Sequence, residues 1–123
     1  MEIYGREVGF LRSVLANCMI AEKAPDGDMG RFVSELLQSP NYNITQRAAA
    51  TMMVALSSGY EQAKAFREPG YRPRPLTEAE VLSLEPKEFN ALFDEALNLF
   101  FLDGKTSVEA EPIPDKKGKK TEE

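Results

Sequence analysis

Apolar side chains recur along the chain at intervals of three and four residues, the spacing that places them on one face of a helix. Two helix starts are clear, because Asp28 can accept amide hydrogens of a first turn and Thr77 with Glu80 has the form of a capping box. The fold class is therefore expected to be mostly all-α, a small bundle of about five helices. The pattern places these helices over residues 12–24, 28–39, 43–66, 77–84 and 85–102.

Three local features interrupt the helical pattern. Residues 68–76 contain three prolines and cannot be helical, because each proline lacks an amide hydrogen and favours extended geometry in the residue before it. Near the start, apolar residues flank Gly5-Arg6, which favours a short N-terminal β-hairpin turning at this pair. Inside the longest helix, Gly59 costs about 1 kcal/mol relative to alanine, so we expect a bend or a pause there.

The patterning indicates one small domain followed by a charged tail. Residues 1–102 contain all the predicted helices, and Asp103-Gly104 is expected to end the last one. Residues 103–123 have no hydrophobic period and combine two prolines with acidic and lysine residues, so we expect them to be disordered. The expected organisation is thus a helical domain over 1–102 and a disordered charged tail over 103–123.

The last predicted helix carries more apolar surface than one core-facing stripe requires. One stripe runs from Phe89 to Phe100, whereas Leu97 and Phe101 project from a different side. Two interpretations stay open: a central helix that the others bury on all sides, or a helix with one side turned to a partner. The candidate protein-binding residues are Phe89, Phe93, Leu97, Phe100 and Phe101, with Tyr60 and Tyr71 as aromatic residues at the rim.

The composition argues against most enzyme chemistry. The chain has no histidine and a single cysteine, so the common catalytic triads and the zinc sites lack their residues. Cys18 lies in an apolar run and is expected to be buried. Asp26 and Asp28 invite a calcium interpretation, but the further ligands of an EF-hand are missing, and a turn with an N-cap is favoured. We expect a non-enzymatic protein with no catalytic residue, metal site or cofactor.

Net charge and hydropathy limit the partners and the location. The net charge of −5 disfavours nucleic acid, since affinity for phosphates comes mainly from lysine and arginine. The longest apolar run, residues 52–56, is far shorter than the roughly 20 residues that cross a bilayer. Charged residues near the N-terminus also argue against a signal peptide. A cytoplasmic protein without nucleic-acid or membrane partners is expected, and the sequence leaves open whether it is a homo-oligomer.

Five short motifs, taken in order, resemble those of a known protein family. The motifs are Tyr4-Gly5-Arg6-Glu7, Ala24-Pro25-Asp26-Gly27-Asp28, Leu56-Ser57-Ser58-Gly59-Tyr60-Glu61, Pro69-Gly70-Tyr71 and Pro73-Arg74-Pro75-Leu76-Thr77. A phenylalanine-rich last helix before a charged tail adds to the resemblance, which covers most of the chain. On these motifs, the chain resembles the tail assembly chaperones of long-tailed, siphovirus-type phages and prophages of Gram-positive bacteria.

The resemblance implies a mostly helical, non-enzymatic protein. Such a protein binds the tape measure protein, helps to recruit tail tube subunits, acts in the bacterial cytoplasm and is absent from the mature virion. It also implies a longer form, made by a translational frameshift, that engages the tail tube protein. Lys116-Lys117 and Lys119-Lys120 are compatible with adenine-rich slippery codons. Two alternatives remain, a small helical nucleic-acid-binding regulator whose first helices supply a helix-turn-helix, and a structural head-tail connector component.

Overall fold

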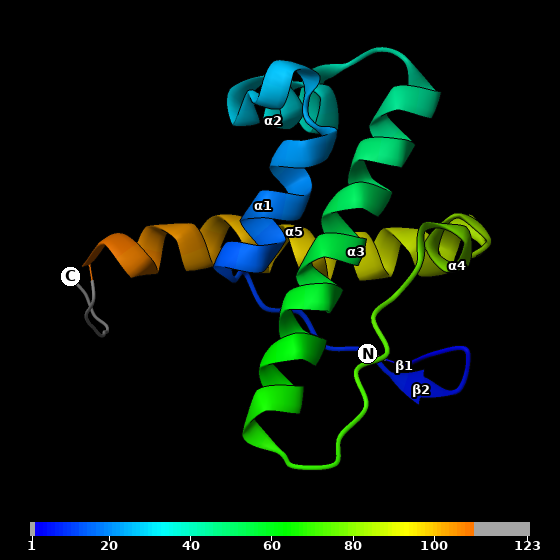
Figure 1. The fold of residues 1–123 in the computed structure, drawn as a ribbon. Coiled ribbons are helices and arrows are strands. Elements are labelled where there is room, and N and C mark those ends of the chain that lie inside the picture. The colour runs from blue at the N-terminus through cyan, green and yellow to red at the C-terminus, as the bar shows by residue number, and fades with distance from the viewer. Residues whose placement is uncertain (1, 110–123) are drawn as a thin grey trace.

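The computed structural model describes residues 2–109, and their side chains as far as Phe101. It confirms a mostly helical fold with five α-helices and a short N-terminal hairpin (Figure 1). Within the described residues the elements are β1 (Glu2–Ile3), β2 (Arg6–Glu7), α1 (Val14–Lys23), the 3-10 turn η1 (Pro25–Gly27), α2 (Met29–Gln38), α3 (Tyr42–Arg67), α4 (Glu78–Leu82) and α5 (Pro86–Glu109).

The long helix α3 is the centre of the molecule, and α1, α2, α4 and α5 all contact it. Helix α1 runs beside α3, α2 lies at the end of the molecule where α3 begins and contacts both α1 and α3, and α5 crosses behind α1 and α3 (Figure 1). Small residues make this arrangement possible, because Ala48, Ala49, Ala50 and Ala55 let neighbouring segments approach the axis of α3. The largest core side chains around it include Phe32, Leu36, Met52, Met53, Leu56, Leu92 and Phe100.

The helix starts follow their capping residues. Asp28 accepts hydrogen bonds from the amides of Gly30 and Arg31, and Thr77 with Glu80 forms both halves of the capping box. Both caps confirm the starts predicted for the second and fourth helices. The carboxylate of Asp28 thus acts as an N-cap, as favoured over a calcium ligand.

The hairpin turns one residue earlier than the sequence indicated. Tyr4 and Gly5 both have positive φ, at 52° and 78°, and Ile3 pairs with Arg6. A two-residue hairpin turn with positive φ at both positions matches the right-handed twist of the flanking strands. The turn is therefore Tyr4-Gly5 and not Gly5-Arg6.

Of the expected bend or pause at Gly59, the pause is wrong, because α3 is one helix from Tyr42 to Arg67. A Cβ atom on Gly59 would lie 2.5 Å from the carbonyl oxygen of Leu11 and 2.5 Å from the hydroxyl of Ser13. Because glycine has no Cβ, the N-terminal segment can approach α3 closely at this position, although glycine is unfavourable in the middle of a helix.

Two further expectations need correction. Cys18 is exposed and not buried. Ala16 and Ile20 face the core, and Cys18, two positions from each of them, points about 200° away around the helix.

Helix α5 does not end at Asp103-Gly104 but continues to Glu109. The rest of the tail that we expect to be disordered, residues 110–123, lies outside the described residues. None of the helices described here is both long and apolar enough to cross a membrane.

Candidate protein-binding surface

The proline-rich connector between α3 and α4 is fixed to the C-terminal half of α3 by hydrogen bonds. The amide of Leu76 donates to the hydroxyl of Ser57 at 2.9 Å, and the amide of Arg74 donates to the carboxylate of Glu61 at 2.9 Å. Two residues of extended chain span about 6.6 Å, and the four helical residues from Ser57 to Glu61 span about 6 Å, so the two spacings match. The alternate residues of this connector, Pro73 and Pro75, are prolines, which have no amide hydrogen to satisfy.

Tyr71 completes this attachment. Its hydroxyl donates a hydrogen bond to Glu61, a residue only 4% exposed, and the ammonium of Lys64 lies 4.7 Å from the centre of its ring. The hydrogen bond to Glu61, with burial and the negative charge of that carboxylate, raises the pKa of the Tyr71 hydroxyl above its usual value. Tyr71 is thus a half-buried anchor of the connector and has a polar partner already.

The N-terminal segment packs against the same half of α3. The amide of Leu11 donates to the carbonyl of Leu56 at 3.0 Å. A Cβ on Gly9 would lie 2.6 Å from the ring of Tyr60, so that ring lies flat against the glycine. The predicted rim residues Tyr60 and Tyr71 therefore both hold extended segments onto α3.

The hairpin joins the same cluster from the other side. The hydroxyl of Tyr4 donates to the carbonyl of Glu80 at 3.1 Å, and Arg6 donates to the carbonyl of Arg74. Arg6 also pairs with the carboxylate of Glu80 at 3.6 Å. Four of the five motifs quoted above thus contact one another at one place, which we call the α3 clamp: the hairpin, residues 56–61 of α3 and both parts of the connector.

The five candidate residues on α5 face the core to different degrees. Phe89 and Phe100 are buried, while Phe93, Leu97 and Phe101 are partly buried and packed against the core. The rings of Phe89 and Phe93 have centroids 6.4 Å apart, and those of Phe100 and Phe101 are 5.2 Å apart. Most of the apolar excess on α5 is therefore used inside the fold, and the binding role of these residues stays a prediction.

Arg12 holds the C-terminal part of α5 in place. Its guanidinium lies 4.1 Å from the centre of the Phe100 ring and donates to the carbonyl of Phe100 at 2.7 Å. A second hydrogen bond, 3.1 Å long, reaches the side chain of Asn17. A cation over a ring with two hydrogen bonds fixes the guanidinium, so Phe100 is covered by the chain itself.

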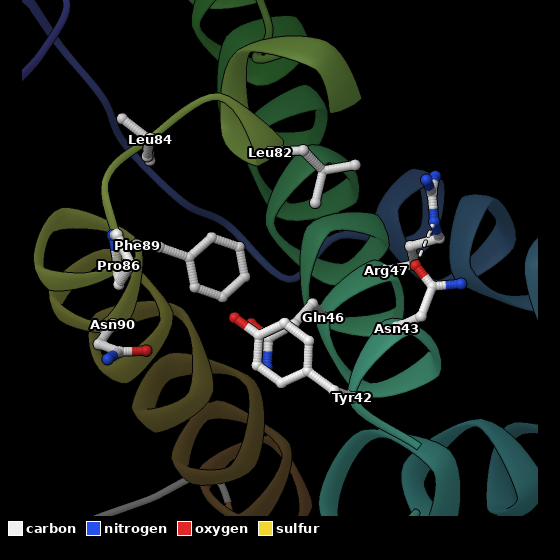
Figure 2. A pocket seen from close by; sticks show the side chains of 9 residues that line it. All are labelled: Tyr42, Asn43, Gln46, Arg47, Leu82, Leu84, Pro86, Phe89 and Asn90. Carbon is white, nitrogen blue, oxygen red and sulfur yellow. Dashed lines mark hydrogen bonds between the residues drawn. The ribbon is translucent and has the colours of Figure 1, made fainter.

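An open pocket of about 340 Å³ lies where α3 begins, facing α4 and α5. Figure 2 shows the rings of Tyr42 and Phe89 directed towards one another across it, from α3 and α5. We call it the Tyr42 pocket. Its lining comprises Tyr42, Asn43, Gln46 and Arg47 of α3, Leu82 and Leu84 at the end of α4, and Pro86, Phe89 and Asn90 of α5.

Large apolar side chains are exposed at this pocket. Tyr42 is 75% exposed and Leu82 is 37% exposed. Of the seven candidate residues, only Phe89 lines the pocket. The sequence analysis missed Tyr42 because it begins this helix at residue 43. The available signal is an aromatic residue in the largely polar stretch 41–47, with no apolar residue three or four positions away.

The polar groups around the pocket suit binding better than catalysis. Arg47 donates to the side chain of Asn43 at 3.0 Å and pairs with Glu78 at 3.6 Å, and Arg47 and Glu78 are both exposed. Amide and guanidinium groups beside apolar side chains are typical of sites that recognise another molecule. Among the described residues, no group of three or more acidic or cysteine side chains could hold a metal ion.

Comparison of the chain with protein-family models, with curated protein sequences and with solved structures gave no match.

Proposed function

We propose that this protein is a non-enzymatic tail assembly chaperone of a long-tailed phage or prophage, and that it binds the tape measure protein during tail morphogenesis. The observation that carries the proposal is the Tyr42 pocket, with exposed apolar residues over a partly apolar floor. An exposed tyrosine and leucine beside a recess of this kind favour contact with another protein. The tape measure protein is proposed as the client, the protein that the chaperone binds, on the family resemblance that the order of the five motifs carries.

The convergence of the motifs supports the resemblance on which the client depends. Segments near the N-terminus, in the middle of α3 and in the connector lie far apart in sequence, yet they meet in the α3 clamp. Four of the five motifs are therefore parts of one structural unit. Because these four build the scaffold, we look for the client-binding residues elsewhere on the molecule.

The chemistry of the client fits the surface. A tape measure protein is a long, helix-rich chain that has to stay soluble until the tail tube forms around it. A net charge of −5 on each bound chaperone keeps such complexes dispersed. Several weak sites along one client allow stepwise displacement by arriving tube subunits.

We further propose that the chaperone helps to recruit tail tube subunits through a frameshift-extended form, works in the bacterial cytoplasm and is left out of the mature virion. The lysine pairs that suggest slippery codons lie outside the described residues. The nucleotide sequence tests this part: a slippery heptamer before the stop codon and an overlapping downstream frame are expected.

Co-expression with the tape measure protein of the same phage tests the proposed function. The tagged chain should co-purify with the tape measure protein and keep it in the soluble fraction, and purified particles should lack the chain. Aggregation of the tape measure protein to the same extent with and without the chain would contradict the proposal. Retention in particles would favour a head-tail connector component, and salt-dependent DNA binding would favour a regulator.

A further inference from the structure

Three arginines near the end of α3 have no partner for their charge within the part of the chain that the structure describes. The chain has seven arginines, and four of them contact a carboxylate, a carbonyl or an aromatic ring: Arg6, Arg12, Arg31 and Arg47. The guanidinium groups of Arg67, Arg72 and Arg74 form no ion pair, hydrogen bond or ring contact with any described residue. All three side chains are exposed. The unpaired arginines are therefore gathered in one stretch, residues 67–74.

These arginines surround one anchored part of the chain. Arg67 is the last residue of α3, and Glu61, six residues earlier, accepts the amide of Arg74. Arg72 follows Tyr71, whose hydroxyl bonds to the same carboxylate. Figure 1 shows the end of α3 and the connector at the edge of the molecule opposite α2. The three positive charges therefore lie at one end of the molecule.

The backbone that carries these arginines is held in place. Arg72 and Arg74 each precede a proline, which restricts both residues to extended geometry. The amide of Tyr71 also donates to the carbonyl of Glu68 at 3.0 Å. The Cα atoms of Arg72 and Arg74 are then about 6.6 Å apart, the same spacing as two alternate residues of an extended peptide. A partner can meet both guanidinium groups without first ordering this backbone.

Positive charge outweighs negative charge around the arginines. Lys64 adds a fourth cation, and Glu68 is the single acidic residue of the segment 64–74. The carboxylate of Glu61 is buried and already bonded. Interaction with the helix dipole accounts for basic residues in the last turn of α3, but this effect falls off within that turn. It does not explain Arg72 and Arg74, which lie in the connector.

An exposed aromatic side chain lies directly beside Arg67 in the chain. Phe66 is 88% exposed, more than any other large apolar side chain that the structure describes. Aromatic and arginine side chains are the residues most enriched at protein interfaces. We call Phe66, Arg67, Arg72 and Arg74 together the arginine patch. It combines an apolar contact with three cations, which suits a partner that carries apolar and anionic side chains together.

The charge of the whole chain favours a short partner. The chain has 20 acidic residues against 15 basic ones, so an extended anionic surface such as a nucleic acid or a membrane would also meet acidic side chains. A short peptide segment can engage the patch alone. Among anionic groups, the carboxylates of such a segment match the planar guanidinium group, which forms two parallel hydrogen bonds with a carboxylate.

We propose that the arginine patch binds an acidic peptide segment of a second protein, with carboxylates paired to Arg67, Arg72 and Arg74 and an apolar side chain beside Phe66. The patch lies at the opposite end of α3 from the Tyr42 pocket. It is a second binding surface, and it does not depend on the identity of the proposed client.

Synthetic peptides test the patch on the full chain. The probe is a fluorescently labelled peptide with glutamate at alternate positions around one leucine, and the control peptide has glutamine in place of each glutamate. Fluorescence anisotropy measures both affinities. The wild-type chain should bind the glutamate peptide about tenfold more tightly or better, and added salt should weaken this binding.

Two triple variants with the same net charge test the location. The patch variant combines Arg67→Gln, Arg72→Gln and Arg74→Gln. The control variant combines Lys23→Gln, Arg31→Gln and Lys87→Gln, which are exposed residues elsewhere. The patch variant should lose about tenfold in affinity for the glutamate peptide or more, and the control less than about twofold. Phe66→Ala should weaken binding about threefold, and Leu37→Ala, on α2, should leave it unchanged.

Each outcome decides the proposal. Equal affinity of the wild type and the patch variant for the glutamate peptide overturns it, and so does equal binding of the two peptides. Tighter binding to single-stranded DNA or to vesicles of anionic phospholipid, lost in the patch variant, would assign the patch to another class of partner and also overturn it. Circular dichroism confirms that each variant folds, and Arg72→Gln with Arg74→Gln decides the question if the triple variant does not. Co-purification with the tape measure protein tests the proposed function separately.

Discussion

The two halves of α3 use the same helix in opposite ways. Around Ser57, Gly59 and Glu61, extended segments cover the helix, and their amides donate hydrogen bonds to Leu56, Ser57 and Glu61. Around Tyr42 and Arg47, the helix lines an open pocket, and these large side chains are exposed. The difference lies in side-chain size, since Ser57 and Gly59 leave room for the backbone of the chain itself.

This contrast separates residues that fix the fold from residues that are free to bind. Four of the five motifs that support the family resemblance lie in or against the covered half, where a replacement disturbs contacts with other segments. The uncovered half shares few of those contacts, so changes there should affect binding more than stability. Four substitutions test this division, beginning with the largest expected effect on stability.

Gly59→Ala should lower the free energy of unfolding by about 2 to 3 kcal/mol, because the new methyl group would overlap the carbonyl of Leu11 and the hydroxyl of Ser13. In an ordinary helix interior the same change raises stability by about 1 kcal/mol. Urea unfolding followed by circular dichroism measures the sign. An increase in stability would mean that the N-terminal segment does not press on α3 and that the covered half is no more constrained than the other.

Glu61→Ala should lower stability by about 2 kcal/mol, because the amide of Arg74 and the hydroxyl of Tyr71 both lose their acceptor. Glu68→Ala removes an exposed carboxylate just beyond the same helix and should change stability by less than about 0.5 kcal/mol. Both are compared by chemical unfolding. Equal changes in stability for Glu61→Ala and Glu68→Ala would show that the buried carboxylate of Glu61 does not stabilise the connector.

Tyr71→Phe should have a smaller effect, about 1 kcal/mol at neutral pH, from the loss of one hydrogen bond. It should also change the response to alkali. Folding raises the pKa of the Tyr71 hydroxyl, so the protonated hydroxyl stabilises the fold. This stabilisation is complete below the usual tyrosine pKa near 10 and is lost as the pH rises through the pKa of Tyr71 in the folded protein. Unfolding free energies measured from about pH 8 to about pH 11 should therefore fall more steeply for the wild type. Parallel curves for the two proteins would contradict the role of this hydroxyl.

Tyr42→Asp should change stability by less than about 0.5 kcal/mol, because the side chain is largely exposed. Tyr42 is the first residue of α3, where a carboxylate interacts favourably with the helix dipole, so a slight gain is the expected sign. Thermal unfolding measures it. A loss approaching that of Gly59→Ala would place Tyr42 in the core and remove the distinction between the two halves.

The helices could be predicted from the sequence because spacing and caps act locally. Asp28 and the Thr77–Glu80 box mark helix starts within a few residues, and the prolines of the connector forbid a helix wherever the chain folds. The pause predicted at Gly59 is wrong because this glycine is explained by its contacts with residues 46 and 48 positions away, which no local pattern of the sequence contains.

The candidate site was harder to predict, for the same physical reason. The apolar excess of α5 is real, but Arg12 and the core cover Phe100, and sequence spacing does not reveal such long-range cover. Cys18, by contrast, is predicted to be buried but is exposed, since an apolar run does not show which side of α1 faces α3. The Tyr42 pocket also needs residues of three different helices, and the positions of α4 and α5 beside Tyr42 depend on tertiary packing alone.

The attachment of Arg12 to Phe100 has a consequence for the order of events during synthesis. The two residues are 88 positions apart, so the guanidinium emerges from the ribosome long before the ring that it covers has been made. Until then Arg12, two residues before α1, has Asn17 as its partner, and a nascent chain that ends before α5 lacks the contact with Phe100. Translation of α5 therefore completes the contacts of a segment near the N-terminus.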